Sequence, residues 1–363
     1  MIDRRLFENI DWFLLGLLLF NSLVGVAFIY SSSHYLPGNY YLRQLAWIAV
    51  GLLTLFLFLT VDYKILLAYS YYAYGLVILV LFGMLFLARG IAGAKSWIRL
   101  SSFQAQPSEV AKIVLILVLA KLFSRDKGML LSTRDMLTSA ALVGVPFFLV
   151  VCQPDLGTAI CFLPLLLAAW VLAGLKRKAL IWITIFLCLA GGASWRFYLK
   201  EYQKRRVTSV VFPGRDPRGA GYQTLQSRIA LGSGGFLGKG YKKGTQSQLR
   251  FLPARHTDFI FSVIGEELGF VGAAVVLLLC FSLLRRVFSS VEKSRDRPGI
   301  YIIFLVGAML TFQTFVNIAM VVGVFPIIGI PLPLLSYGGS SLLANYIGVA
   351  LVLNVKMRRF ANI

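Results

Sequence analysis

The sequence has few charged residues, and acidic residues are especially scarce. Charged side chains make up 14% of its 363 residues, and 36 lysines and arginines stand against only 15 aspartates and glutamates. Hydrophobic residues make up 58%, and apolar runs of about 20 residues, long enough to cross a bilayer, recur along the whole chain. This composition excludes an ordinary soluble domain and predicts an integral membrane protein.

Cysteine and histidine are too few, or too scattered, for several kinds of site. The four cysteines fall in or beside apolar segments and form no Cys-x-x-Cys pair, which argues against a disulfide framework or a zinc site. The two histidines are too few for a histidine-based metal cage. The glycines around Lys239 do not form a P-loop, because that motif requires glycine where the chain has Ser233, and serine or threonine where it has Gly240.

We predict an all-α polytopic membrane protein whose residues 1–363 form a single domain. About ten apolar segments qualify as transmembrane helices. Their approximate cores are residues 12–31, 42–61, 65–88, 109–123, 136–152, 156–174, 179–198, 259–284, 300–323 and 341–355. The first segment lacks a clear small-residue cleavage site, so we interpret it as a retained span rather than a signal peptide.

The distribution of charge predicts an orientation. Basic residues concentrate at both ends of the chain and in the connections near residues 64, 121–134, 176–178 and 285–297, and the positive-inside rule places these parts in the cytoplasm. The large loop at residues 199–257 is an exception, because it carries 12 basic residues although the alternation of spans puts it outside. Such a loop needs an anionic partner, either lipid head groups or a phosphate-bearing substrate.

Three of the rare acids, Glu109, Asp155 and Asp258, begin predicted spans at the outer side of the membrane. Each alone is explained as well by a favourable interaction with a helix N-terminus, which contributes about 0.3–1 kcal/mol. Three together, beside a basic loop, favour a functional site. Lys112 follows Glu109 by one helical turn, so an ion pair is expected. The pair is either structural or in contact with substrate.

Two further acids, Glu266 and Glu267, lie inside the apolar run after Asp258. At least one of them is expected to face other helices rather than lipid, because an acid exposed to lipid is costly. The large loop also contains Tyr222, Leu225 and Ile229 at a spacing that predicts a short helix at the membrane interface.

The connection before the last span reads GVFPIIGIPLPLLSYGGSSLLANY, and prolines and glycines interrupt its apolar run. Irregular backbone at membrane depth is tolerated only where it is buried in protein or lines a cavity. The pattern therefore favours an outer re-entrant or cavity-lining segment that ends at residues 336–341. A plain turn is the alternative.

An outer site restricts the chemistry. ATP is absent outside the cell, so a bond-forming reaction there needs a substrate that is already activated, and a lipid-anchored sugar pyrophosphate would be one. An aspartate could remove a proton from an attacking sugar hydroxyl, and basic residues could stabilise the pyrophosphate leaving group. A helix N-terminus would tend to keep Asp258 ionised.

Several ordered motifs then carry a resemblance to a known family. They are GAKSWIRL, FQAQPSEVAK, QPDLGTA, YQKRRV, DPRGAGYQTLQSRIALGSGGFLGKGY, GTQSQLRFLPARHTDFIFSVIGEELG and PLPLLSYGGSS, and they cover residues 93–341 in order. The chain resembles the SEDS family of bacterial cell-wall glycosyltransferases, the shape, elongation, division and sporulation proteins. The GTQSQL motif is similar to the elongation branch of this family rather than to its division branch.

The resemblance implies a peptidoglycan glycosyltransferase in the bacterial cytoplasmic membrane. It would polymerise lipid II into glycan strands at the outer face, for cell elongation and rod shape. Asp258 matches the essential aspartate of the family and would deprotonate the acceptor hydroxyl in an inverting displacement. Trp97, Glu109, Lys112 and Asp155 match positions in functional motifs. The other residues predicted to bind substrate or support the site are Arg206, Lys239, Gln246, Arg255, His256, Thr257, Ser336, Tyr337 and Ser340.

The resemblance also implies partners. A class B penicillin-binding protein would supply the transpeptidase that this chain lacks. Lipid II, undecaprenyl-linked glycan, membrane lipids and other elongation-complex proteins complete the expected partners, and no nucleic acid is expected. No cofactor is established by the sequence, and a divalent cation, magnesium or manganese, is left open.

A lipid II flippase, or a transporter of lipid-linked oligosaccharides, is the main alternative. It would need polar groups through the depth of the membrane, whereas the acids of this chain cluster at one end. Lys112, Glu266 and Glu267 keep the alternative open. A scaffold without catalytic activity would leave the outer carboxylates unexplained.

Overall fold

The computed structural model describes residues 8–87, 96–100, 103–124, 131–197, 201–212, 214, 216 and 219–358. The first residues of the predicted cytoplasmic N-terminus, the last of the C-terminus and residues 125–130 of a predicted basic connection lie outside this part of the chain.

Helices account for most of the described chain. Seven of them are long and apolar enough to cross a membrane. They are α2 (Trp12–Ser33), α3 (Tyr40–Thr60), α4 (Tyr63–Leu87), α6 (Thr133–Cys152), α13 (Ile260–Phe288), α14 (Arg297–Val322) and α15 (Gly339–Met357). The other predicted spans are α5 (Pro107–Ser124), the broken pair α7 (Leu156–Ile160) and α8 (Leu163–Leu172), and α9 (Arg177–Phe197). Each predicted span thus coincides with a helix or a helix pair, and the all-α fold is confirmed.

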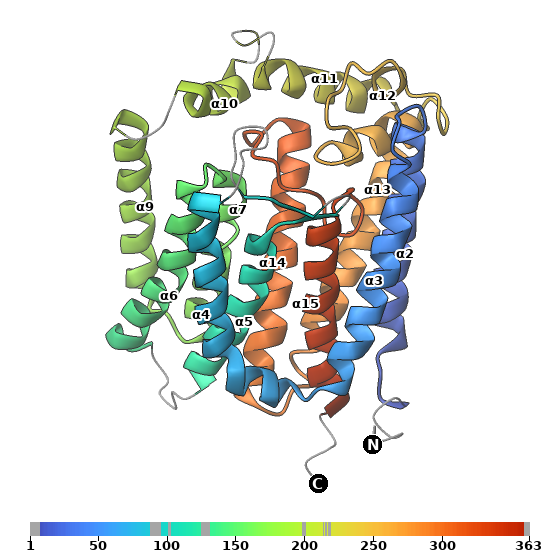
Figure 1. Cartoon of the computed structure of the whole chain (residues 1–363). Helices are drawn as coiled ribbons and strands as arrows, with labels where there is room; N and C mark the ends of the chain where they lie inside the picture. Colours follow the sequence, from blue (N-terminus) through green and yellow to red (C-terminus); the bar gives the residue numbers. More distant parts are fainter. Residues whose placement is uncertain are drawn as a thin grey trace.

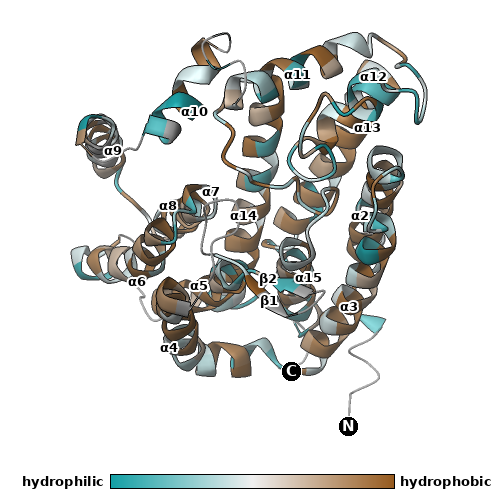
Figure 2. Cartoon of the chain, turned by 45° about the horizontal axis from the view of Figure 1, so that its top comes forward, coloured by the Kyte–Doolittle hydropathy of each residue, from teal (hydrophilic) through white to brown (hydrophobic). Residues whose placement is uncertain are grey.

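The predicted large loop contains three helices. They are α10 (Glu201–Val211), α11 (Ala220–Ser233) and α12 (Thr245–Gln248), and they lie across the end of the bundle opposite the ends of the described chain (Figure 1). A small antiparallel hairpin, β1 (Ile98–Leu100) and β2 (Phe103–Ala105), precedes α5 and pairs Ile98 with Ala105. Hydrophilic stretches gather on α10 and α12, whereas the bundle helices are largely hydrophobic (Figure 2).

The helix α11 confirms that the large loop contains a short helix over Tyr222, Leu225 and Ile229, and its place at the membrane interface stays a prediction. Leu225 and Ile229 are exposed, and Tyr222 is half-buried. The opposite face, with Thr224 and Ser227, is buried against the bundle. This arrangement leaves the apolar side chains free to meet the membrane interface.

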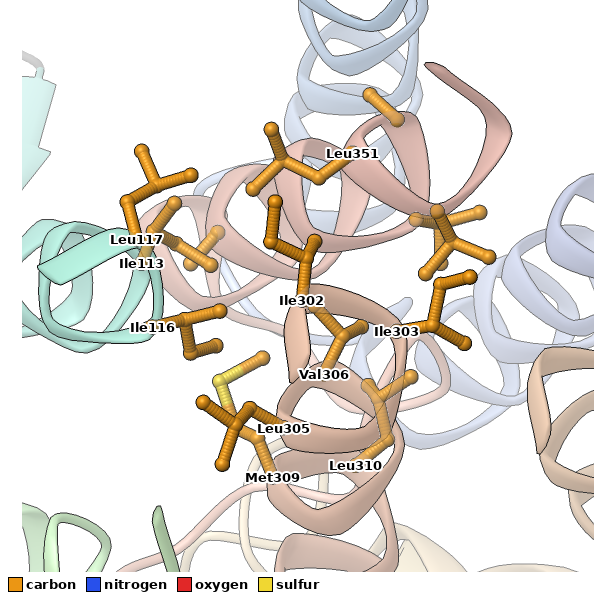
Figure 3. Close-up of a cluster of buried hydrophobic side chains, with 14 of the residues drawn as sticks. Ile113, Ile116, Leu117, Ile302, Ile303, Leu305, Val306, Met309, Leu310 and Leu351 are labelled. Carbon is orange, nitrogen blue, oxygen red and sulfur yellow. The ribbon is translucent and has the colours of Figure 1, made fainter. Parts of the chain in front are cut away.

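The core of the bundle lies where α5, α14 and α15 meet. Figure 3 shows Ile113 and Ile116 of α5 packed around Ile302 and Val306 of α14, with Leu351 of α15 beside them. These helices are apolar around much of their circumference, and such helices are stable only when other helices surround them. The core thereby fixes the ends of α5 and α14 that carry parts of the site described below.

A buried ion cluster ties three helices together at the end where the described chain begins and ends. Asp11 accepts hydrogen bonds from Arg286 Nε at 2.7 Å and Nη2 at 2.9 Å, and it also contacts Lys356. Burial alone would raise the pKa of Asp11, but the bonds from Arg286 and Lys356 lower it to about 2. We call Asp11, Arg286 and Lys356 the inner ion cluster. It brings the start of α2 next to the ends of α13 and α15.

Replacing Asp11 by asparagine should destabilise the fold, because two cations lose their carboxylate partner. A buried polar group left without its partner costs about 1–3 kcal/mol, and more when it is charged. We expect a clear drop in the thermal unfolding temperature in detergent. The matched variant Glu8→Gln changes an exposed acid close by and should leave that temperature nearly unchanged. Equal effects of the two substitutions would contradict the role assigned to the cluster.

Candidate active site

Asp258 lies just outside a helix rather than at its cap. The helix α13 begins at Ile260, and its N-cap position is Phe259, whose side chain makes no capping bond. The backbone N–H groups of Thr257 and Phe259 both donate to the carbonyl oxygen of Ala254, at 3.1 and 3.3 Å. Asp258 therefore sits in a tight turn, and its carboxylate is not used to satisfy the helix start.

Burial determines the acidity of Asp258. It raises the pKa of this half-buried carboxyl to about 6, while the hydroxyl of Thr257 and the guanidinium of Arg206 act in the opposite direction. Asp258 is therefore still mostly ionised at pH 7, as expected, but its pKa is set by burial rather than by a helix N-terminus. A carboxylate with a pKa near the working pH is suited to general base catalysis.

Asn317 of α14 holds the backbone around Asp258. Its side-chain amide donates to the carbonyl oxygen of Asp258 at 2.9 Å and to that of Ile330 at 2.8 Å. It is fully buried. On the other side, a Cβ atom added at Gly329 would lie 3.8 Å from Asp258 Oδ2. The carboxylate thus stands beside an uncrowded stretch of backbone.

Residues 323–338 form the irregular segment predicted before the last span. Ser336 donates from its hydroxyl to the carbonyl oxygen of Thr257 at 2.6 Å and accepts from the N–H of Leu332 at 2.9 Å. The N–H of Tyr337 donates to the carbonyl oxygen of His256 at 2.8 Å. Ser336 is buried, so the segment is packed in protein as predicted and is not a plain turn. It supports the Asp258 turn directly.

His256 and Arg255 lie beside this turn. The His256 ring packs near Tyr40 and Tyr337, with ring centroids 4.7 and 5.8 Å away. Burial, aided by Arg255, lowers the pKa of His256 to about 4, so the imidazole is neutral at pH 7. Arg255 is 4% exposed and donates from Nε to the carbonyl oxygen of Ser32 at 2.6 Å.

A second group of predicted site residues lies at the start of α5 and α7. Lys112 Nζ contacts Glu109 Oε1 at 2.8 Å, and both side chains are buried, which confirms the predicted ion pair. Asp155 is the N-cap of α7, where its carboxylate accepts from the N–H of Thr158 at 3.1 Å. Trp97 lies just before β1 and is half-buried.

Gln106 joins this group to the start of α15. Its side-chain amide donates to Asp155 Oδ2 at 2.8 Å, and its backbone N–H donates to Ser340 Oγ at 3.1 Å. Ser340 in turn donates to the carbonyl oxygen of Gln104 at 3.2 Å. Ser340 therefore supports the hairpin that leads into α5, and none of these bonds requires a ligand.

The irregular segment also runs between the two groups. A Cβ atom added at Gly157, two residues after Asp155, would collide with the carbonyl oxygen of Ile328, so α7 packs directly on this segment. Arg206 of α10 donates to the carbonyl oxygen of Ile327 at 3.4 Å. Asp258, Arg206 and Asp155 are thus gathered around residues 327–329, at one end of the bundle.

Lys239 and Gln246 lie elsewhere, next to Glu266 of α13. Lys239 Nζ contacts three oxygens, Ser233 Oγ at 2.7 Å, Thr245 Oγ1 at 2.8 Å and Glu266 Oε1 at 2.9 Å. The backbone N–H of Gln246 donates to Glu266 at 2.8 Å. Of the two roles predicted for Lys239 and Gln246, substrate binding or support, these contacts favour support. Glu266 is fully buried in protein, as expected for at least one of the two acids.

Clusters suited to a resident metal are missing from the part of the chain that the structure describes, where no three His, Cys, Asp or Glu side chains are grouped to hold an ion. Glu109, Glu266 and Asp11 form ion pairs instead, and Asp155 caps α7. The described donor set therefore does not fit a metal ion held by the protein alone.

The fold and the site define a multi-pass membrane protein with acidic and basic groups gathered at one end of its bundle. The family model FtsW/RodA/SpoVE, described as cell cycle protein, matches residues 6–360. Peptidoglycan glycosyltransferase MrdB of Escherichia coli strain K12 is 37% identical over 347 residues, which cover 95% of this chain and 92% of MrdB.

Solved structures are similar to this chain over nearly its whole length. A chain of a peptidoglycan synthase complex, described as coordinating polymerization and crosslinking, is 35% identical with a TM-score of 0.83, covering 97% of this chain and 99% of that one. Rod shape determining protein RodA of Thermus thermophilus is 30% identical with a TM-score of 0.73, covering 97% and 98%. This chain belongs to the FtsW/RodA/SpoVE family, the SEDS family that its motifs predicted.

Besides Gln106, the sequence analysis missed Asn317 as a residue of this site. Its only signal is an asparagine within an apolar span, and several spans carry such polar residues. Replacing it by leucine removes both hydrogen bonds and frees the Asp258 turn. Misplacing a catalytic group by about 1 Å can cost roughly 10²-fold in rate, so we expect a loss of that order in glycan polymerisation.

Asn354 provides a matched control for Asn317→Leu. It is equally buried, and its amide also donates to two backbone carbonyls, those of Phe58 and Val61, at the opposite end of the bundle. Asn354 Oδ1 also accepts from the N–H of Tyr63 and from Arg358. Asn354→Leu should therefore lower thermal stability at least as much as Asn317→Leu but leave the rate per folded molecule intact. If both variants keep full activity, Asn317 does not position the base.

Proposed function

We propose that this chain is a peptidoglycan glycosyltransferase that polymerises lipid II, with Asp258 as general base at the outer face of the cytoplasmic membrane. The observation that carries the proposal is the Asp258 turn. A carboxylate with a raised pKa is held through its backbone by Asn317 and lies beside the guanidinium of Arg206.

The depth of Asp258 fits a lipid-anchored substrate. Asn317, which binds the Asp258 carbonyl, lies about 30 Å along α14 from Arg297 at a rise of about 1.5 Å per residue. That equals the thickness of the hydrocarbon core of a bilayer, about 30 Å. With the inner ion cluster in the cytoplasmic leaflet, Asp258 stands at the outer boundary, where sugars carried on a lipid pyrophosphate would meet it.

The reaction is a displacement at the anomeric carbon of the donor sugar. The Asp258 carboxylate takes the proton of the acceptor 4-hydroxyl, and the hydroxyl oxygen forms a bond to the anomeric carbon of the donor. The bond from this carbon to the lipid pyrophosphate breaks, and the pyrophosphate leaves with the electron pair. Attack from the opposite side converts an α-linked donor into a β-linked product.

Cations beside the turn favour the departing pyrophosphate. Arg206 acts on Asp258 and therefore lies close to the reacting groups. Arg255 is buried, and no carboxylate pairs with it among the residues whose contacts the structure describes. A buried cation of this kind is stabilised by an anion, which agrees with a role in binding the donor pyrophosphate. A magnesium or manganese ion carried by the pyrophosphate would belong to the substrate.

The partner expected at the crosslinking step is a class B penicillin-binding protein. Support comes from the similar chain in a peptidoglycan synthase complex described as coordinating polymerization and crosslinking. Lipid II, undecaprenyl-linked glycan, membrane lipids and other elongation proteins complete the proposed partners. The chain would act in elongation, with both termini cytoplasmic.

The flippase alternative loses the residues that supported it. Lys112 pairs with Glu109, Glu266 binds Lys239, and Glu267 accepts from Ser31 Oγ at 2.5 Å. Each of these charges is engaged in a local contact rather than aligned along a path through the membrane. The base-catalysed transfer accounts for Asp258, which a flippase would not require.

Asp258→Asn tests the role of the base. The change keeps the size of the side chain but removes the proton acceptor, and general base catalysis contributes about 10²–10⁴-fold in rate. Polymer made from purified lipid II should fall by that order, while thermal stability and partner co-purification persist. Glu292→Gln, at an exposed acid of a predicted cytoplasmic connection, is the control and should keep normal activity. Near-normal polymer from Asp258→Asn would sink the proposal.

The pH dependence provides a second test. Because the base works in its ionised form, activity should be full well above the pKa of Asp258, about 6, and should fall about tenfold for each pH unit below it. Arg206 lowers this pKa, so Arg206→Gln should move the fall in activity to a higher pH. The neighbouring exposed Arg205 is the control, and Arg205→Gln should leave the profile in place. An unshifted profile in Arg206→Gln would refute the contact.

A further inference from the structure

The helix α13 is broken at Gly269, and a loop of the large outer segment closes the break. Gly269 has φ 66° and ψ −160°, outside the helical region. The N–H groups of Lys239 and Gly240 donate to the carbonyl oxygens of Glu266 and Glu267, at 3.1 and 2.9 Å. The loop therefore takes over carbonyls that the broken helix leaves unpaired.

The helix also donates hydrogen bonds to the loop. The N–H groups of Phe270 and Val271 donate to the carbonyl oxygens of Gly235 and Phe236, at 2.9 and 3.2 Å. A Cβ atom added at Gly269 would lie 2.6 Å from the Phe236 carbonyl oxygen, so the two backbones touch where glycine permits it. Residues 234–241, which we call the outer wedge, are thus fixed to the start of the helix that follows Gly269.

Two independent helices measure the depth of the outer wedge. Phe270 lies about 24 Å along α13 from Arg286 of the inner ion cluster, at a rise of about 1.5 Å per residue. Ala27, whose carbonyl oxygen accepts from Tyr241 Oη at 2.7 Å, lies about 24 Å along α2 from Asp11 of the same cluster. Both values are less than the roughly 30 Å of a hydrocarbon core, and any tilt of the helices reduces them further.

The tip of the outer wedge exposes large apolar side chains at this depth. Phe236 is 69% exposed and Leu237 76%. The Phe236 ring stacks on that of Phe270, with centroids 5.9 Å apart. Below them the outward face of α13 continues with the exposed side chains Val275 and Leu278. The tip therefore extends the bilayer-facing surface of a membrane-length helix.

We propose that the outer wedge is inserted into the outer leaflet, with Phe236 and Leu237 in contact with lipid acyl chains. Lys243 and Arg250 follow the tip in the sequence and are exposed, so they are free to meet anionic head groups. The bonds to Glu266 and Glu267 join the wedge to the short first part of α13, which begins two residues after Asp258. Lipid contact at the wedge thus holds the turn of Asp258 at its depth.

Site-specific quenching of a fluorophore tests this insertion. Leu237→Cys, Leu278→Cys and Val324→Cys are made singly in a chain whose four native cysteines are replaced, and each is labelled with bimane. Leu278 is a control inside the membrane-length part of α13. Val324 is 72% exposed and lies two residues beyond the end of α14, whose last residue, Val322, is about 38 Å along the helix from Arg297, so it is the aqueous control. Polymerisation by each labelled chain verifies its fold.

The labelled chains are reconstituted into vesicles that contain phospholipid with a nitroxide on its acyl chain, and iodide is added from outside. We expect the label at position 237 to be quenched by the nitroxide lipid as strongly as that at 278, with little quenching by iodide. The label at 324 should show the reverse. Iodide quenching at 237 equal to that at 324 would overturn the insertion. Protection from both quenchers would also overturn it, because protein would then cover the tip. Neither readout depends on the proposed catalytic role of Asp258.

Discussion

The two hydrogen bonds donated by Asn317 are the interaction on which the site depends. They join the carbonyl oxygen of Asp258 to that of Ile330, so the turn before α13 and the irregular segment before α15 cannot move independently. Both stretches lack helical hydrogen bonds, and buried backbone groups without partners are costly. A side-chain amide on the rigid core helix α14 meets this need at two points. The position of the Asp258 turn then follows from the packing of the bundle.

Glu266 of α13 is a second buried polar group that links a helix to a neighbouring loop. A buried carboxylate is tolerated when cations and hydrogen-bond donors surround it, and here Lys239, Thr245 and the N–H groups of Gln246 and Ser247 do so. Acidic residues inside an apolar run therefore need not indicate a path for ions or substrate. In this protein Glu266 joins the loop that contains Lys239 and α12 to the broken helix α13.

The sequence predicted the parts of the fold that local patterns encode. Apolar runs located the spans, and start signals placed Glu109, Asp155 and Asp258 in or just before the first turns of their helices. Contacts between distant segments were not predictable. The apolar run after Asp258 does not indicate the break at Gly269. The hydrogen bonds that stabilise the break come from residues 235–240, and the sequence does not show that this earlier loop contacts the helix. Before its hydrogen-bond partners are known, Asn317 cannot be told apart from other polar residues within spans. Those other residues are Asn21, Gln313, Asn345 and Asn354.

The acidity of Asp258 results from a balance between burial and charge. Arg206 favours the ionised form, burial opposes it, and burial is the larger effect, so the pKa rises from 3.8 to about 6. At pH 7 a group with this pKa is still about 90% ionised, yet it binds a proton roughly 100-fold more tightly than an ordinary aspartate. A carboxylate fully satisfied by a helix N-terminus would be ionised too, but it would be a weaker base. Placing Asp258 two residues before α13, in a turn held by its backbone, leaves the carboxylate free to accept a proton.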